Sequence, residues 1–106
     1  MRLSGTRKRN GYMKYFDWDE NKNILLKETR NISFEEIVLS IANNKILEVL
    51  EHPNKQKYPS QKMLIVEVRK YAFIVPFVED NERYFLKTIY PSREATKKYL
   101  SKDKED

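Results

Sequence analysis

The hydrophobic period of this chain changes near residue 44, and that change limits the folds that it can adopt. Before residue 44, apolar side chains recur at helical spacing, most clearly at Phe34, Ile37, Val38 and Ile41. After it, apolar residues alternate with polar ones or form short continuous runs, which are typical of strands. A helical first part and a strand-rich second part, within 106 residues, predict one domain of the α+β class.

The expected order is a strand, two helices, four antiparallel strands in a meander and a last helix. The first strand is predicted at 12–18, the helices at 20–30 and 33–44, the later strands at 45–51, 62–69, 71–79 and 83–90, and the last helix at 92–100. We expect the helices to gather on one side of the meander.

The sharpest local signal is the capping box at Ser33 and Glu36. The Ser33 hydroxyl is expected to accept from the amide of residue 36, while the Glu36 carboxylate reaches back to the cap. Ile32 and Ile37 are spaced to form the hydrophobic staple that accompanies such a start. We therefore predict a helix start at Ser33, after a first helix that ends at Asn31.

Three later positions predict turns or interruptions. Asn43-Asn44 can close the second helix in the left-handed conformation. Arg69-Lys70 is a possible tight turn between two strands, and Pro76 is expected to leave a gap or bulge in the ladder of a central strand.

The net charge of +5 is unevenly distributed, because four of these charges belong to Arg2, Arg7, Lys8 and Arg9. We expect residues 1–12 to be a disordered basic leader or a tag, residues 13–100 to be the domain, and residues 101–106 to be a charged tail. The leader could also be an arm that binds nucleic acid through counterion release. Both interpretations stay open.

The composition excludes several classes of protein. The chain has no cysteine, so it has neither a disulfide framework nor a thiolate zinc site. Its apolar runs, at 63–66 and 71–78, are too short for a membrane helix. No Gly-rich phosphate loop, metal-ligand spacing or Ser-His-Asp pattern is present. We expect a cytoplasmic protein without metal, cofactor or membrane partner.

The junction between the last strand and the last helix carries the strongest functional signal. Ser92 is the expected N-cap, Tyr90 precedes it, and Arg93, Lys97 and Lys98 follow within two turns. Unpaired amides and the positive end of the helix dipole favour an anion at such a place. The pattern therefore predicts an RNA-phosphate site.

An RNA-phosphate site could cleave its ligand without a metal only if it supplied a base, an acid, and cations that hold the charge developing on the phosphate. Arg93 is the first candidate for the phosphate clamp, with Lys97, Lys87 and Tyr90 as further catalytic candidates. A second interpretation of Arg93 is an ordinary surface residue paired with Glu94 or Glu82. Lys97 could instead be part of a solvated helix face, and Tyr90 could instead pack in the core or at a strand edge.

The candidates for RNA binding are Arg83, Ser92, Lys98 and His52. Arg83 and Lys87 fall on one face of the expected strand 83–90, so they could extend the basic site beside Ser92 and Lys98. His52, the single histidine, is a possible acid or base in a polar loop, or an ordinary surface residue.

Three segments, in this order and spacing, resemble the BrnT family of type II toxins over residues 13–100. They are Tyr15 to Lys22 (YFDWDENK), Ile32 to Glu36 (ISFEE) and Lys87 to Tyr99 (KTIYPSREATKKY). The residues that match the family pattern are Phe16, Trp18, Asp19, Lys22, Ser33, Phe34, Glu35, Glu36, Ser92, Arg93, Ala95 and Thr96.

This resemblance implies a RelE-like fold and a metal-independent endoribonuclease that inhibits translation and growth. It also implies neutralisation by a dimeric antitoxin of the ribbon-helix-helix type, with operator DNA bound only through that complex. Apolar surface around Ile24, Leu25 and Leu26 is the expected landing site for the antitoxin.

The chain departs from the family at Thr29-Arg30-Asn31, where relatives commonly have Lys-His-Gly, and at Tyr90-Pro-Ser-Arg-Glu94. A non-catalytic binding module or co-repressor that keeps the fold is therefore the main alternative. A nucleic-acid binder that uses the Arg7-Lys8-Arg9 arm is the third.

Overall fold

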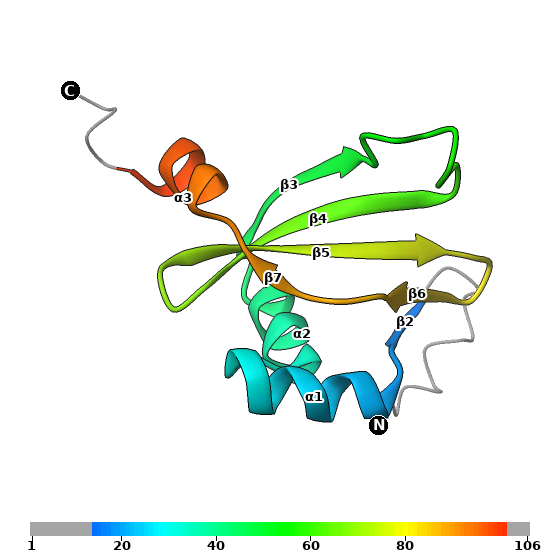
Figure 1. Ribbon diagram of the computed structural model, residues 1–106, viewed down its shortest axis with the longest axis horizontal. Coiled ribbons are helices and arrows are strands. Elements are labelled where there is room, and N and C mark those ends of the chain that lie inside the picture. Colours follow the sequence, from blue (N-terminus) through cyan, green and yellow to red (C-terminus); the bar gives the residue numbers. More distant parts are fainter. Residues whose placement is uncertain (1–13, 102–106) are drawn as a thin grey trace.

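The computed structural model describes residues 14–101, which form one α+β domain (Figure 1). The expected leader and residues 102–106 of the expected tail lie outside the described residues. In chain order the elements are β2 Tyr15–Asp17, α1 Glu20–Arg30, α2 Phe34–Ala42, β3 Ile46–Glu51, β4 Gln61–Val68, β5 Tyr71–Glu79, β6 Arg83–Leu86, β7 Tyr90–Pro91 and α3 Arg93–Leu100. None of the helices within this range has the length and apolar character needed to cross a membrane.

The strands form one sheet in the order β2-β6-β5-β4-β3, with β7 also beside β5. The expected meander is present, because β3 to β6 pair antiparallel in sequence order. Beside this meander, β2 runs parallel to β6, with Tyr15 opposite Arg83. Segments far apart in the sequence therefore lie side by side in the sheet, which is mixed rather than purely antiparallel.

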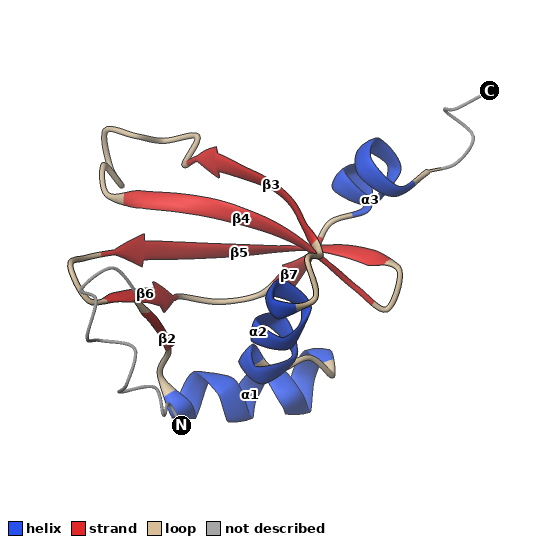
Figure 2. Ribbon diagram, turned by 180° about the vertical axis from the view of Figure 1, so that it is seen from behind, coloured by secondary structure: helices blue, strands red, loops and turns tan. Residues whose placement is uncertain are grey.

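The helices cover opposite faces of this sheet. On one face, Leu64 and Val66 pack in the main core beneath α1 and α2. On the other face, Ile65 and Ala72 pack with Ala95 of α3. Figures 1 and 2 show α3 apart from the other two helices. The expectation that all helices gather on one side is therefore wrong for α3, because alternation in β4 and β5 leaves a second apolar strip that this helix covers.

The local signals around the second helix are mostly confirmed. Asn31 ends α1 in the left-handed conformation, at φ 56°. The Ser33 hydroxyl accepts from the Glu36 amide at 3.1 Å, so Ser33 is the N-cap of α2. Ile32 and Ile37 are both buried in the main core, as the staple requires.

The reciprocal half of the capping box has another partner. The Glu36 carboxylate accepts from Nη2 of Arg69 at 2.7 Å, and the same nitrogen donates to the Asn31 carbonyl at 2.9 Å. Arg69 therefore links the end of α1 and the start of α2 to the β4–β5 turn. This partner comes from a distant part of the chain, so local spacing could not predict it.

The tight turn expected at Arg69-Lys70 is confirmed. Both residues have positive φ, 53° and 66°, as the two central residues of a type I′ hairpin turn do. Asn44, at φ 62°, is the left-handed residue after α2.

The strand expected at 83–90 is divided in two. The Lys87 amide donates to the Pro76 carbonyl at 2.8 Å, but proline has no N–H with which to complete the pair. The ladder stops after Leu86 and resumes only at Tyr90, opposite Ile74. The expected gap at Pro76 is thus confirmed, and it creates the separate strand β7. At the other end of the chain, the expected strand 12–18 is described only as Tyr15–Asp17.

Asn23 is a buried polar residue in the first helix that the sequence pattern did not single out. Its amide nitrogen donates to Glu35 at 2.8 Å, and its side-chain oxygen accepts from the Phe34 amide at 2.8 Å. The side chain therefore stabilises the start of α2 against α1 with both of its polar atoms.

Candidate nucleic-acid interface

The start of α3 is fixed to the sheet by a compact set of hydrogen bonds. Ser92 is the N-cap as expected, and its hydroxyl accepts from the Ala95 amide at 3.0 Å. The Ser92 amide donates to the Ala72 carbonyl at 2.9 Å. Thr96 Oγ1 accepts from the Ala72 amide at 2.9 Å and donates to the Ser92 carbonyl at 2.8 Å. These hydrogen bonds therefore fix the start of the helix relative to β5.

The cations of α3 are exposed and carry uncompensated charge. Arg93, Lys97 and Lys98 are all exposed, and none of them makes an ion pair with a residue in the range 14–101. Arg93 therefore forms neither of the alternative ion pairs, with Glu94 or with Glu82, within residues 14–101. Three charges are therefore available to an anionic ligand on one short helix.

Tyr90 and Lys87 lie on the segment that leads into this helix. Tyr90 is half-buried and pairs with Ile74, so it faces the same side of the sheet as α3. Lys87 is exposed, and its Nζ lies 5.5 Å from the centre of the Phe85 ring. The structure thus places Lys87, Tyr90 and Arg93 in sequence along one connection between β6 and α3.

Arg83 is different, because its charge is already compensated. Its Nη1 donates to Asp17 at 2.6 Å, and its Nε donates to Asp80 at 3.4 Å. The hydrogen bond to Asp17, followed by that to Asp80, raises the pKa of Arg83 above its ordinary value. The guanidinium lies 5.1 Å from the Phe85 ring, on the same side as Lys87, as alternation predicted. Its hydrogen bonds nevertheless join parts of the domain to one another.

His52 lies away from the α3 cations. It follows β3, where its amide donates to the Gln61 carbonyl at the start of β4, and Figure 1 shows this loop at the opposite end of the sheet from α3. Its Nδ1 accepts from the Asn54 amide at 3.0 Å, and its ring lies 4.5 Å from that of Tyr58. The structure therefore does not bring His52 to Arg93.

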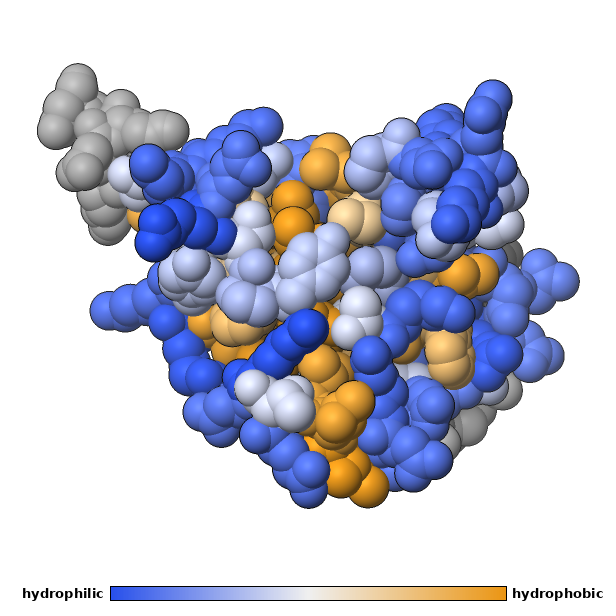
Figure 3. Space-filling model, viewed as in Figure 1, coloured by the Kyte–Doolittle hydropathy of each residue, from blue (hydrophilic) through white to orange (hydrophobic). Residues whose placement is uncertain are grey.

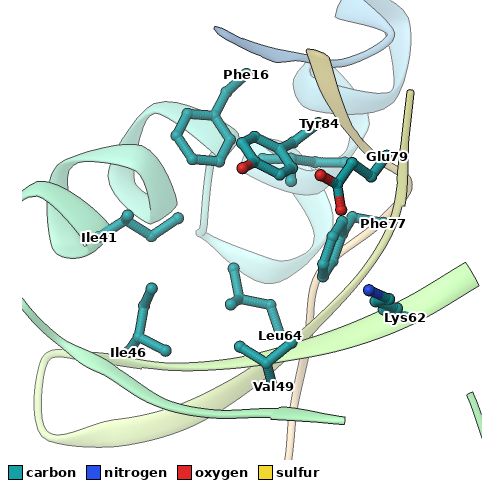
Figure 4. Close-up of a pocket in the computed structure, with 10 residues that line it drawn as sticks. Phe16, Ile41, Ile46, Val49, Lys62, Leu64, Phe77, Glu79 and Tyr84 are labelled. Atoms are coloured by element: carbon teal, nitrogen blue, oxygen red, sulfur yellow. The ribbon is translucent and has the colours of Figure 1, made fainter. Parts of the chain in front are cut away.

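An apolar hollow of about 380 Å³ opens on the other face of the sheet, beside α2. Figure 4 shows the rings of Phe16, Phe77 and Tyr84 along one side of it, across from Ile41 and Ile46. Lys62 and Glu79 are the charged residues of its lining. The hollow is remote from the α3 cations, since the sheet separates them. Its wall combines β2, β6 and α2, whose proximity depends on the tertiary fold, so the sequence alone did not reveal it.

The predicted partner surface on α1 is divided between core and solvent. Leu26 is only 2% exposed and belongs to the main core, whereas Ile24 and Leu25 are 47% and 49% exposed. Figure 3 shows apolar surface at the bottom of the molecule, where α1 lies. Only Ile24 and Leu25 are therefore accessible to a partner.

Comparisons of the chain with protein-family models, with curated proteins and with solved structures find no match. Residues 14–101 contain no group of three or more His, Cys, Asp or Glu side chains placed to bind a metal ion.

Proposed function

We propose that this protein is the toxin of a type II toxin–antitoxin pair and acts as a metal-independent endoribonuclease that inhibits translation and growth. The observation that carries the proposal is the uncompensated charge of Arg93 and Lys97 on a helix that Ser92 and Thr96 fix beside Tyr90. The resemblance to the BrnT family over residues 13–100 supports the same reaction.

In the proposed reaction, the 2′-hydroxyl of RNA attacks the adjacent phosphorus and the 5′ oxygen leaves. Arg93 binds the phosphate, because a guanidinium can donate two parallel hydrogen bonds to its oxygens. Lys97, one helical turn on, adds charge beside it. Tyr90 and Lys87, on the segment that leads to Arg93, are the proposed groups for proton transfer to and from the two ribose oxygens.

A non-catalytic binding module is the second candidate, because the chain has Thr29-Arg30-Asn31 where relatives commonly have Lys-His-Gly and so lacks a histidine there. Ile24 and Leu25 are half-exposed on α1, and the hollow beside α2 is lined mostly by apolar side chains. In either case, the proposed partner is an antitoxin of the ribbon-helix-helix type, which covers apolar surface and brings the complex to operator DNA. The two candidates differ in whether the chain cleaves RNA.

Induced expression in a bacterium tests the proposal, with growth and the integrity of total RNA followed together. The wild type is compared with an Arg93→Ala, Lys97→Ala double variant. A matched control is Lys45→Ala, Lys57→Ala, which removes two exposed lysines that have no ion pair within the described part of the chain. We expect arrest and RNA fragmentation from the wild type and the control, and neither from the Arg93, Lys97 variant.

Arrest by all three proteins would place the active residues elsewhere. Harmless expression of a folded wild type would contradict the ribonuclease and favour the binding module.

A further inference from the structure

The arginines of the described domain fall into two groups. Residues 14–101 contain four arginines. Arg69 is paired with Glu36 at 2.7 Å, and Arg83 is paired with Asp17 at 2.6 Å. Arg30 and Arg93 make no ion pair with any residue in that range. Two guanidinium charges are therefore uncompensated, and only Arg93 was expected to bind phosphate.

Arg30 is held at the same chain segment that leads to Arg93. It is the last residue of α1, and its Nη1 donates to the Ile89 carbonyl at 2.6 Å. Ile89 is buried in the main core and directly precedes Tyr90. The bond uses one of the five guanidinium N–H donors, and its acceptor is neutral. Arg30 therefore keeps its charge and most of its donors.

The two free arginines reach this segment from opposite faces of the sheet. Arg30 comes from α1, which covers the face of the main core, while Arg93 begins α3 on the other face. Four residues of extended chain span at most about 14 Å, so the Ile89 carbonyl and Arg93 are within that distance of each other. Tyr90 lies between them in the chain. Two guanidinium groups and one aromatic ring could therefore contact the same polymer.

Arg30 also has a purely structural role at the end of α1. A cation at the C-terminus of a helix complements the helix dipole, and the bond to Ile89 satisfies a carbonyl beside the short strand β7. That role needs one donor and no second anion. It leaves unexplained why Arg30 reaches the segment that leads to Arg93, the other described arginine without a carboxylate partner.

We propose that the guanidinium of Arg30 is a second phosphate-binding group, and that the ligand is single-stranded RNA lying across residues 89–93. The inference rests on the proposed function and adds the path of the substrate. Arg30 and Arg93 bind phosphates of the same strand, and Tyr90 contacts the nucleotide between them. A flexible single strand can bend to follow the segment of residues 89–93, where a stiff duplex would make fewer contacts.

Fluorescence anisotropy with a labelled 2′-O-methyl single-stranded RNA tests the assignment, because the modified RNA binds without being cleaved. Arg30→Gln removes the charge and keeps an N–H donor for the Ile89 carbonyl. The matched control is Lys27→Gln, which removes one charge from the last turn of the same helix. The hydrogen bond from Asn23, and to a lesser degree the charge of Lys27, lowers the pKa of Glu35, so Lys27 interacts with a different group from Arg30.

We expect Arg30→Gln to weaken RNA binding about tenfold at low salt and to lower the slope of log affinity against log salt by about 0.7. Arg93→Gln should have a similar effect, and Lys27→Gln should change affinity less than about twofold. Arg30→Lys should keep the wild-type slope and bind about threefold more weakly, because it retains the charge without the fork.

Each contrary result has a distinct meaning. If Arg30→Gln behaves like Lys27→Gln while Arg93→Gln weakens binding, Arg30 is not in the site and the proposed function stands. If affinity falls with no change in slope, Arg30 acts only by supporting the Ile89 carbonyl, and the assignment is wrong. If Arg30→Gln does not fold, wild-type affinity in Arg30→Lys overturns the assignment. If the wild type binds no RNA, the proposed function fails as well.

Discussion

The side-chain oxygen of Thr96 accepts a hydrogen bond from the backbone N–H of Ala72 at 2.9 Å, and this bond joins α3 to the start of β5. Ala72 is fully buried, so water cannot replace the threonine as the acceptor. The helix that carries Arg93 and Lys97 is therefore positioned by a residue with no charge of its own. Proposed RNA contacts at the surface depend on this buried contact.

Thr96→Val should destabilise the protein by about 1–3 kcal/mol, because an isosteric side chain leaves the Ala72 N–H buried without a partner. Urea unfolding followed by circular dichroism measures the effect. Thr29→Val is the matched control, since the Thr29 hydroxyl bonds only the Leu25 carbonyl on an exposed helix face. Equal stability of the two variants would show that the Thr96 contact is not required.

Asn23→Leu should cost about 2 kcal/mol or more, although it replaces a polar residue in the core by an apolar one. The substitution leaves the Phe34 amide without its acceptor and the Glu35 carboxylate without its donor. Asn21→Leu, on an exposed position of the same helix, is the control. A gain in stability from Asn23→Leu would contradict a structural role for these hydrogen bonds.

Lys70→Gly should stabilise the protein by about 0.5–1 kcal/mol, because Lys70 has a positive φ of 66° that glycine adopts without strain. Arg69→Gly, at φ 53°, should not be stabilising, since it also removes the ion pair with Glu36. Thermal unfolding of both variants provides the measurement. A lower midpoint for Lys70→Gly than for the wild type would argue against strain in this turn.

Arg83→Gln should reduce RNA cleavage less than Lys87→Gln does. The charge of Arg83 is compensated by Asp17 and Asp80, whereas Lys87 has no carboxylate partner among residues 14–101. Initial cleavage rates at matched ionic strength test the difference, with folding of each variant checked by circular dichroism. A larger loss for Arg83→Gln would place the RNA path along β6.

Acid should destabilise the protein partly through Glu35. The hydrogen bond from Asn23 holds the pKa of Glu35 below its ordinary value of 4.5. The resulting stabilisation is complete above pH 4.5 and is lost as the pH falls through the lowered pKa. Glu35→Gln keeps an acceptor for Asn23 but does not titrate, so its stability should fall less between pH 6 and about pH 3. Glu28→Gln, on an exposed part of α1, should lose stability as the wild type does.

Features that depend on neighbouring residues were predictable from the sequence. The N-caps at Ser33 and Ser92, the end of the first helix at Asn31 and the turn at Arg69-Lys70 each follow from a few consecutive side chains. The same is true of the α+β class and the meander, since both follow from a change of hydrophobic period.

Features that depend on contacts between distant residues were not predictable in this way. The position of α3 follows from the faces to which Ile65 and Ala72 belong once β4 and β5 are paired. The partner of Glu36 is Arg69, which lies 33 positions away in the sequence. Alternation grouped Arg83 with Lys87 correctly, yet it could not show that Asp17 would compensate Arg83 alone.

The parallel pairing of β2 with β6 has a consequence for how the chain acquires its structure. Asp17 and Arg83 are joined across this pair, although 66 positions separate them in the sequence. Among residues 14–101, β2 pairs with β6 alone, so it gains this neighbour only after β6 has left the ribosome, and α3 emerges later still. Closing so long a loop is slow compared with forming a hairpin. The domain is therefore complete only after the segment that carries β6, β7 and α3 has been synthesised.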